Sequence, residues 1–121
     1  MAERSIYGLG SLWIISFDPS VGTEIRKTRP GLIISGSVFN ERRSKVSVLP
    51  FTSARPNDPR ISPAVVLVAA SKDNGLTADS LLVCIEPMTF DKSRLIKYLG
   101  QLDTELLQQV QSILKQYLAL R

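Results

Sequence analysis

The sequence predicts an α+β fold in which a small, strongly bent sheet or partial barrel is followed by a C-terminal helix. Five or so strand-like runs follow one another at short spacing, separated by turn-forming residues. The C-terminal segment instead places apolar side chains at the three-to-four-residue spacing of a helix. The length of 121 residues fits one domain, residues 1–121, with enough chain to bury a core.

The predicted strands are apolar or alternating runs bounded by Gly, Pro or Asn-Gly. The connector 37–45 and the segment 91–95 are each expected to form at most a turn of helix. Three prolines make the stretch Thr52–Pro63 an exposed loop. In chain order, the five predicted strands are Ser11–Phe17, Gly31–Gly36, Lys45–Phe51, Ala64–Ala70 and Ser80–Met88.

The C-terminal helix has both a start signal and a buried face. Asp103 is the expected N-cap, and Leu102 before it is placed to pack on Leu107. The apolar stripe along one face of this helix is interpreted as part of the core or of a dimer interface. Its members are Leu106, Leu107, Val110, Ile113, Leu114, Tyr117 and Leu118.

The composition excludes several classes of chemistry. With no histidine and one cysteine, the chain forms no internal disulfide, no Cys/His metal site and no Ser-His-Asp triad. Cys84 lies in an apolar run, which predicts a buried, inert thiol. No apolar run is long enough for a membrane span, and the N-terminus lacks a signal-peptide core. We therefore expect a soluble cytoplasmic protein without membrane association.

The positive charge is concentrated in one segment. The net charge is +4, but residues 26–60 alone carry +6, which leaves −2 for the rest of the chain. Such a segment favours an anionic partner, and nucleic acid is the leading candidate. The alternative is a solvated surface without a ligand. The basic residues are Arg26, Lys27, Arg29, Arg42, Arg43, Lys45, Arg55 and Arg60.

Four short patterns stand in a fixed order along the chain. They are Gly10-x-Leu12-Trp13, Asp18-Pro19-x-x-Gly22-x-Glu24, Arg29-Pro30 and Pro50-x-Thr52-Ser53. Together with Gly75-Leu76, Asp91–Leu95 and Gly100–Leu102, they resemble the MazF/PemK family of toxin endoribonucleases, the mRNA interferases of type II toxin–antitoxin systems.

The resemblance implies a small SH3-like antiparallel barrel or sheet of about five to seven strands with a C-terminal helix. It also implies a homodimer that cleaves single-stranded RNA without a metal or other cofactor. In this family the ribose 2′-hydroxyl attacks the adjacent phosphate, leaving a 2′,3′-cyclic phosphate and a 5′-hydroxyl. A cognate antitoxin with an acidic, disordered C-terminal tail neutralises the toxin.

The family's catalytic Arg and Thr match Arg29 and Thr52. A guanidinium offers a planar fork of donors to the charge that develops on phosphoryl oxygens, and Pro30 fixes the backbone beside it. The Thr52 hydroxyl is expected at the rim of the sheet, where Ser53 assists. The polar loop before Arg29 is interpreted as a lid whose Arg26 and Lys27 contact RNA phosphates.

The second loop adds Arg55 and Arg60 as candidate RNA contacts, the alternative being a solvated loop. Tyr7 and Trp13 are candidates for base stacking, against the alternative of core packing. For Arg29, the alternative to catalysis is a structural ion pair with Glu24.

The general base is left open. Arginine stays protonated in proteins, so Arg29 is a poor candidate. The position of a carboxylate found in some family members is Ile85 here, and Glu86 follows it on the opposite face of a strand. Three alternatives remain: a displaced Glu86, Glu24, or no carboxylate. A common family arginine is replaced by Met88.

Two other functions are compatible with the same fold. One is a non-enzymatic toxin that poisons DNA gyrase through the C-terminal helix, and the other is a catalytically inactive nucleic-acid-binding module. Neither requires Arg29 and Thr52, so the presence of both residues favours the endoribonuclease.

Overall fold

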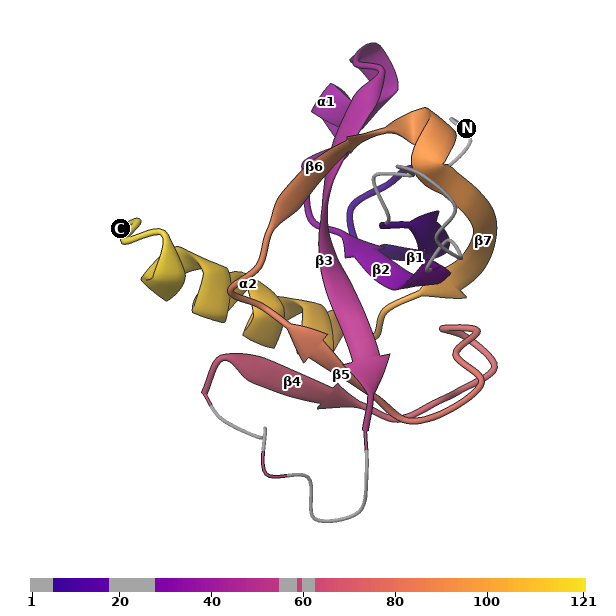
Figure 1. The fold of residues 1–121 in the computed structure, drawn as a ribbon. Helices are drawn as coiled ribbons and strands as arrows, with labels where there is room; N and C mark the ends of the chain where they lie inside the picture. The colour runs from indigo at the N-terminus through magenta and orange to yellow at the C-terminus, as the bar shows by residue number, and fades with distance from the viewer. Residues whose placement is uncertain (1–5, 18–27, 55–58, 60–62) are drawn as a thin grey trace, which may run out of the picture.

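The computed structural model describes residues 6–17, 28–54, 59 and 63–121 (Figure 1). It confirms the α+β class: seven antiparallel strands are followed by a C-terminal helix. The strands are β1 (Ser11–Ser16), β2 (Thr28–Ile33), β3 (Lys45–Ser53), β4 (Val65–Val68), β5 (Ser80–Val83), β6 (Met88–Asp91) and β7 (Leu95–Gln101). The helices are α1 (Ser37–Arg42), the 3-10 turn η1 (Lys92–Arg94) and α2 (Thr104–Tyr117).

The nine-residue strand β3 organises the sheet. The strand order is β4-β5-β3-β2-β1-β7, and β6 also pairs with β3. The N-terminal half of β3 pairs with β6, its middle with β2, and its last three residues with β5. Because β3 exchanges partners along its length, the sheet bends around it without closing (Figure 1).

The predicted strand Ser80–Met88 is in fact two strands, β5 and β6, separated by a bulge. Phe51 of β3 pairs with Leu82 of β5, and Val48 of β3 pairs with Met88 of β6. These two pairs are three residues apart along β3 but six residues apart along the β5–β6 segment, which therefore bulges outward. The bulge contains Pro87 and faces Pro50 on β3. Neither proline has an N–H to donate, which is consistent with the interruption of the ladder between Val48↔Met88 and Phe51↔Leu82.

Strand β7 was not predicted from the sequence. It pairs with β1 through two register shifts, one between Leu12 and Trp13 and the other between Ile14 and Ile15. These irregularities remove the period-two pattern by which a strand is recognised, and Ile96, Lys97 and Tyr98 are all exposed. The 3-10 turn before β7 was predicted, and the Asp91 carboxylate caps it by accepting from Ser93 N at 2.9 Å.

Two hydrophobic clusters hold the sheet together. Helix α2 covers one cluster, which includes Leu12, Leu49, Phe51 and Val110. The second cluster includes Trp13, Ile15 and Val48, with Tyr7, Phe17 and Phe90 packed against it. The helical stripe is confirmed as core up to Leu114, whereas Tyr117 and Leu118 are half exposed. Asp103 is confirmed as the N-cap, because its carboxylate accepts from Glu105 N and Leu106 N.

Asn40 joins two segments that are distant in the sequence. Its fully buried amide donates to Tyr7 O at 2.7 Å and to Ser35 O at 2.9 Å. Its Oδ1 accepts from Ser35 Oγ, which in turn accepts from Ser47 N at 3.0 Å. The side chain therefore fixes the N-terminal segment to the turn between β2 and β3.

Replacing Asn40 with Ala should destabilise the protein strongly. The change leaves two carbonyl oxygens without their donor in the interior, so we expect the free energy of unfolding to fall by about 2–4 kcal/mol. Urea denaturation followed by circular dichroism measures this, with Glu41→Ala as the control because Glu41 is the exposed next residue of α1. Equal stability of the two variants would show that the network contributes little.

The Cys84 thiol should be unreactive in the folded protein. It is completely buried, and desolvation raises its pKa from 9.0 to about 11. A shift of this size lowers the thiolate fraction at pH 8 roughly a hundredfold. We expect labelling by a thiol reagent such as DTNB to be slow without denaturant and complete within minutes in urea. Prompt labelling of the native protein would contradict the burial of this residue.

Candidate active site

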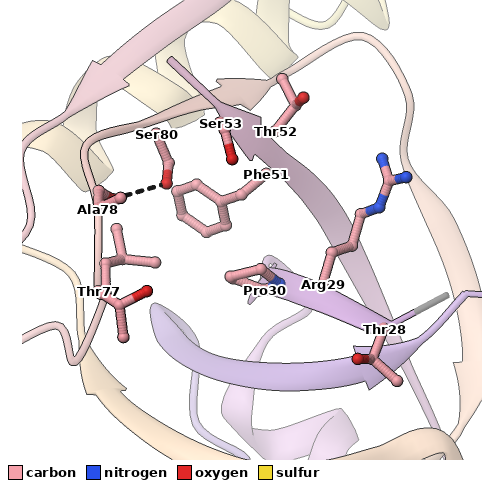
Figure 2. Close-up of a pocket in the computed structure, with 10 residues that line it drawn as sticks. Thr28, Arg29, Pro30, Phe51, Thr52, Ser53, Thr77, Ala78 and Ser80 are labelled. Atoms are coloured by element: carbon pink, nitrogen blue, oxygen red, sulfur yellow. Dashed lines mark hydrogen bonds between the residues drawn. The ribbon is translucent and has the colours of Figure 1, made fainter. Parts of the chain in front are cut away.

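A pocket of about 310 Å³ opens where β2 and β3 separate. The two strands pair from Ile33↔Val48 to Gly31↔Pro50 and then part. The next partner of Phe51 would be Pro30, which has no N–H to offer, and β3 pairs with β5 from Phe51 onward. The resulting gap is lined by Thr28, Arg29, Pro30, Phe51, Thr52, Ser53, Leu76, Thr77, Ala78 and Ser80 (Figure 2).

Arg29 lies on β2, beyond the end of the β2–β3 pairing. Its backbone is held on the other side by β1, where it pairs with Ile15. The side chain is exposed, and its Cζ atom lies 5.9 Å from the centroid of the Phe17 ring. Figure 2 shows its side chain extending from β2 toward the end of the pocket that Thr52 of β3 lines. The guanidinium is thus fixed at its base and accessible at its tip.

Thr52 and Ser53 form the opposite wall. They are the last two residues of β3 and pair with Leu81 and Ser80 of β5. Thr52 is half-buried and Ser53 is exposed. The structure therefore brings Arg29 of β2 and Thr52 and Ser53 of β3 to one pocket.

The third wall, Leu76–Ala78, was not assigned to the site from the sequence. Asn74 shapes this loop: its Oδ1 accepts from Ser71 N at 3.0 Å and from Leu76 N at 2.9 Å. Gly75 has a φ of +73°, and a Cβ there would lie 2.3 Å from Leu99 O. The Asn74-Gly75 pair predicts a turn from the sequence alone. Its position beside the pocket depends on the fold and is not evident from the sequence.

Hydroxyl groups account for much of the polar lining. Thr28 and Thr77 are exposed at the pocket, while the Ser80 hydroxyl donates to Ala78 O at 2.9 Å (Figure 2). Together with Thr52 and Ser53, Thr28 and Thr77 place neutral hydroxyl groups around one arginine, whereas the Ser80 hydroxyl proton is already bonded to Ala78 O. Such a combination suits an anionic ligand such as a phosphate.

Glu86 is not brought to this pocket. It lies exposed in the bulge between β5 and β6, next to the exposed Ile85. Met88, at the position of a common family arginine, is half-buried against the second hydrophobic cluster. The other predicted site residues lie outside the described residues: Glu24, Arg26, Lys27, Arg55 and Arg60.

The rings of Trp13 and Tyr7 are stacked on each other, Trp13 being buried and Tyr7 half-buried. Their ring centroids are 5.2 Å apart with an interplanar angle of 1°, and Trp13 Nε1 donates to Ile6 O at 3.1 Å. Trp13 is 5% exposed and belongs to the second cluster. Of the two alternatives for Trp13, the structure supports core packing.

Within the described ranges, no group of three or more His, Cys, Asp or Glu side chains is arranged to hold a metal ion. In the same part of the chain, every helix is too short or too polar to span a membrane.

Comparison with known proteins relates the whole chain to one group. Residues 9–118 match the family described as PemK-like, MazF-like toxin of type II toxin–antitoxin system. Endoribonuclease MazF9 of Mycobacterium tuberculosis is 28% identical over 92% of this chain and 95% of its own length. Endoribonuclease PemK of Escherichia coli is 32% identical over 68% of this chain and 59% of its own.

A solved structure of an endoribonuclease in complex with its cognate antitoxin, from a mycobacterial species, has the same fold. Its TM-score is 0.72 at 23% identity, covering 94% of this chain and 96% of that one. The family match spans nearly the entire sequence and includes every strand of the sheet as well as the C-terminal helix. The chain therefore belongs to the PemK-like, MazF-like toxins of type II toxin–antitoxin systems.

Proposed function

We propose that this chain is a toxin endoribonuclease that cleaves single-stranded RNA in the pocket between β2 and β3. The observation that carries the proposal is that Arg29 and Thr52, from different strands, line one pocket. The volume of about 310 Å³ is at the lower end of the range for small ligands, which suits one nucleotide and its phosphate. The two relatives named as endoribonucleases support the activity.

The proposed reaction is attack of a ribose 2′-hydroxyl on the adjacent phosphorus. The bond between phosphorus and the 5′-oxygen of the next nucleotide breaks as the bond to the 2′-oxygen forms. The 2′-hydroxyl loses its proton and the departing 5′-oxygen gains one, which leaves a 2′,3′-cyclic phosphate and a 5′-hydroxyl. Negative charge grows on the non-bridging oxygens during this step. Arg29 stabilises that charge as a permanent cation, and Thr52 donates a hydrogen bond to the same group.

Proton transfer falls to a group other than histidine, which the chain lacks. Because arginine side chains are poor bases in proteins, we assign Arg29 an electrostatic role. The position of Glu86 outside the pocket disfavours it as the base. Two alternatives therefore remain for proton transfer. Either Glu24 is the base, or the reaction uses no carboxylate base.

The proposed regulation is neutralisation by a cognate antitoxin with an acidic C-terminal tail. The solved complex of a structurally similar endoribonuclease with its antitoxin supports this partnership. The cationic charge of residues 26–60 provides electrostatic complementarity to such a tail. We further propose that the toxin acts as a homodimer in the cytoplasm, on RNA and without a metal cofactor.

RNA cleavage should depend on Arg29, on Thr52 and on the ribose hydroxyl. In excess EDTA, the wild type should cut a mixed-sequence RNA and leave intact the same RNA with 2′-deoxyribose at the mapped site. Arg29→Ala and Thr52→Ala should each lower kcat/KM about 10²–10³-fold, the range for removing one donor from a charge-stabilising site. Thr52→Ser keeps the hydroxyl and is the matched control.

Each result that differs from these expected cleavage results would contradict a different part of the proposal. Cleavage of the deoxy substrate would exclude the 2′-hydroxyl as nucleophile, and loss of all cleavage in EDTA would exclude a metal-independent reaction. If Arg29→Ala and Thr52→Ala cut like the wild type, the active site lies elsewhere. A wild type that cuts no RNA would favour the gyrase poison or the inactive binding module.

The two carboxylates should differ in their effect on the pH dependence of cleavage. Because Glu86 does not line the pocket, Glu86→Gln should leave kcat within about twofold of the wild type across the pH range. If Glu24 is the base, Glu24→Gln removes the acidic limb of the pH–rate profile. The measurement is single-turnover cleavage between about pH 3.5 and 9, because carboxylates ordinarily titrate near pH 4. A loss of that limb in Glu86→Gln would show that the base is Glu86 after all.

A further inference from the structure

A row of two aromatic rings connects Arg29 to a second arginine, Arg94. The Arg29 Cζ atom lies 5.9 Å from the Phe17 ring centroid. The Phe17 ring meets Phe90 edge to face, with centroids 5.4 Å apart and an interplanar angle of 85°. The Arg94 Cζ atom then lies 5.4 Å from the Phe90 centroid. Each phenylalanine therefore contacts one cation and the other ring.

The Phe17 ring is seated against the backbone of β2. A Cβ atom at Gly31 would lie 3.2 Å from Phe17 Cζ and 2.5 Å from Ile15 Cδ1. The absence of a side chain at Gly31 therefore creates the space that these two residues occupy. Gly31 is two residues from Arg29 on the same strand, so the ring rests beside the base of the arginine.

Arg94 holds this arrangement from its far end. Besides covering Phe90, its Nη1 donates to Ser16 O at 3.2 Å, directly before Phe17 in the chain. Arg94 belongs to the short turn η1, whose first residues are ordered by the Asp91 cap. The following residue, Leu95, pairs with Ile15 of β1. One side chain thus fixes both the end of β1 and the second ring.

We propose that Arg94 is a positioning residue for Arg29, acting through Phe90 and Phe17. An exposed arginine samples many rotamers, and the Phe17 face selects those that direct the guanidinium along the ring and into the pocket. Arg94 does not line the pocket, so it does not touch the RNA phosphate at that site. The effect of Arg94 on catalysis rests on the proposed function. The ordering of the Arg29 side chain by Arg94 does not depend on the proposed function.

The alternative is that Arg94 only stabilises the fold. The matched control is Lys92, which lies two residues earlier in the same 3-10 turn. Its Nζ is 4.6 Å from the Tyr7 centroid, so it forms a contact of the same kind with a ring outside the row. Arg94→Met and Lys92→Met each remove one cation and keep an unbranched apolar side chain. Arg94→Lys restores a cation over Phe90 and should recover part of the effect.

The first measurement is the mobility of Arg29 itself. In protein labelled with ¹⁵N-arginine, the Nε–Hε signal of Arg29 is identified by its absence from the Arg29→Lys spectrum. We expect its order parameter to fall clearly in Arg94→Met and in Phe17→Leu but not in Lys92→Met. An unchanged order parameter in Arg94→Met, with the fold intact by circular dichroism, would overturn the proposal. This result does not depend on whether the protein cleaves RNA.

The second measurement is single-turnover cleavage at a temperature well below the melting transition of every variant. Arg94→Met should lower the rate about three- to thirtyfold, the range of a cation–π contact, with unchanged affinity for the 2′-deoxy RNA. In an Arg29→Lys background the same change should have little further effect, because both act through one group. The proposal would be overturned if Arg94→Met lowered the cleavage rate as much in the Arg29→Lys background as it does in the wild type. It would also be overturned if Lys92→Met lowered the rate as much as Arg94→Met does. If the wild type does not cleave RNA, the proposed function fails and the mobility result alone decides.

Discussion

The interruption of the β2–β3 ladder is the constraint on which the site depends. Pro30 has no N–H at the position where Phe51 would be paired, so the two strands part after Gly31↔Pro50. Beyond that point β2 stays attached to β1, while β3 turns to β5. One missing donor thus allows two strands of a continuous sheet to become opposite walls of a pocket. The Arg-Pro pair places a cation at this gap.

The chemistry of the pocket follows from what surrounds the arginine. The described lining contains neutral hydroxyls and no carboxylate, so the positive charge of Arg29 is not offset within it. Electrostatic stabilisation is effective only when the donor is already oriented before charge develops. The rings of Phe17 and Phe90 supply that orientation through packing, and they connect the site to the start of β7.

Local patterns were sufficient for the fold class, most strands and the capped helix, whereas Arg29 and Thr52 were chosen through the family resemblance. The local patterns failed for β7, whose bulges hide the alternation, and at the break between β5 and β6 around Pro87. The wall formed by Leu76–Ala78 was also missed, because a turn signal does not show which distant strand the turn will contact. The row from Arg29 to Arg94 joins residues far apart in the chain, so only the assembled sheet reveals it.

The role of the β2–β3 pocket is tested most directly by a crystal structure with an RNA that carries 2′-deoxyribose at the mapped cleavage site. Such a substrate keeps the scissile phosphate and lacks the nucleophile. We predict that this phosphate lies between β2 and β3, within hydrogen-bond distance of the Arg29 guanidinium and the Thr52 hydroxyl. An RNA whose scissile phosphate is bound on another surface, with the β2–β3 pocket unoccupied, would contradict it.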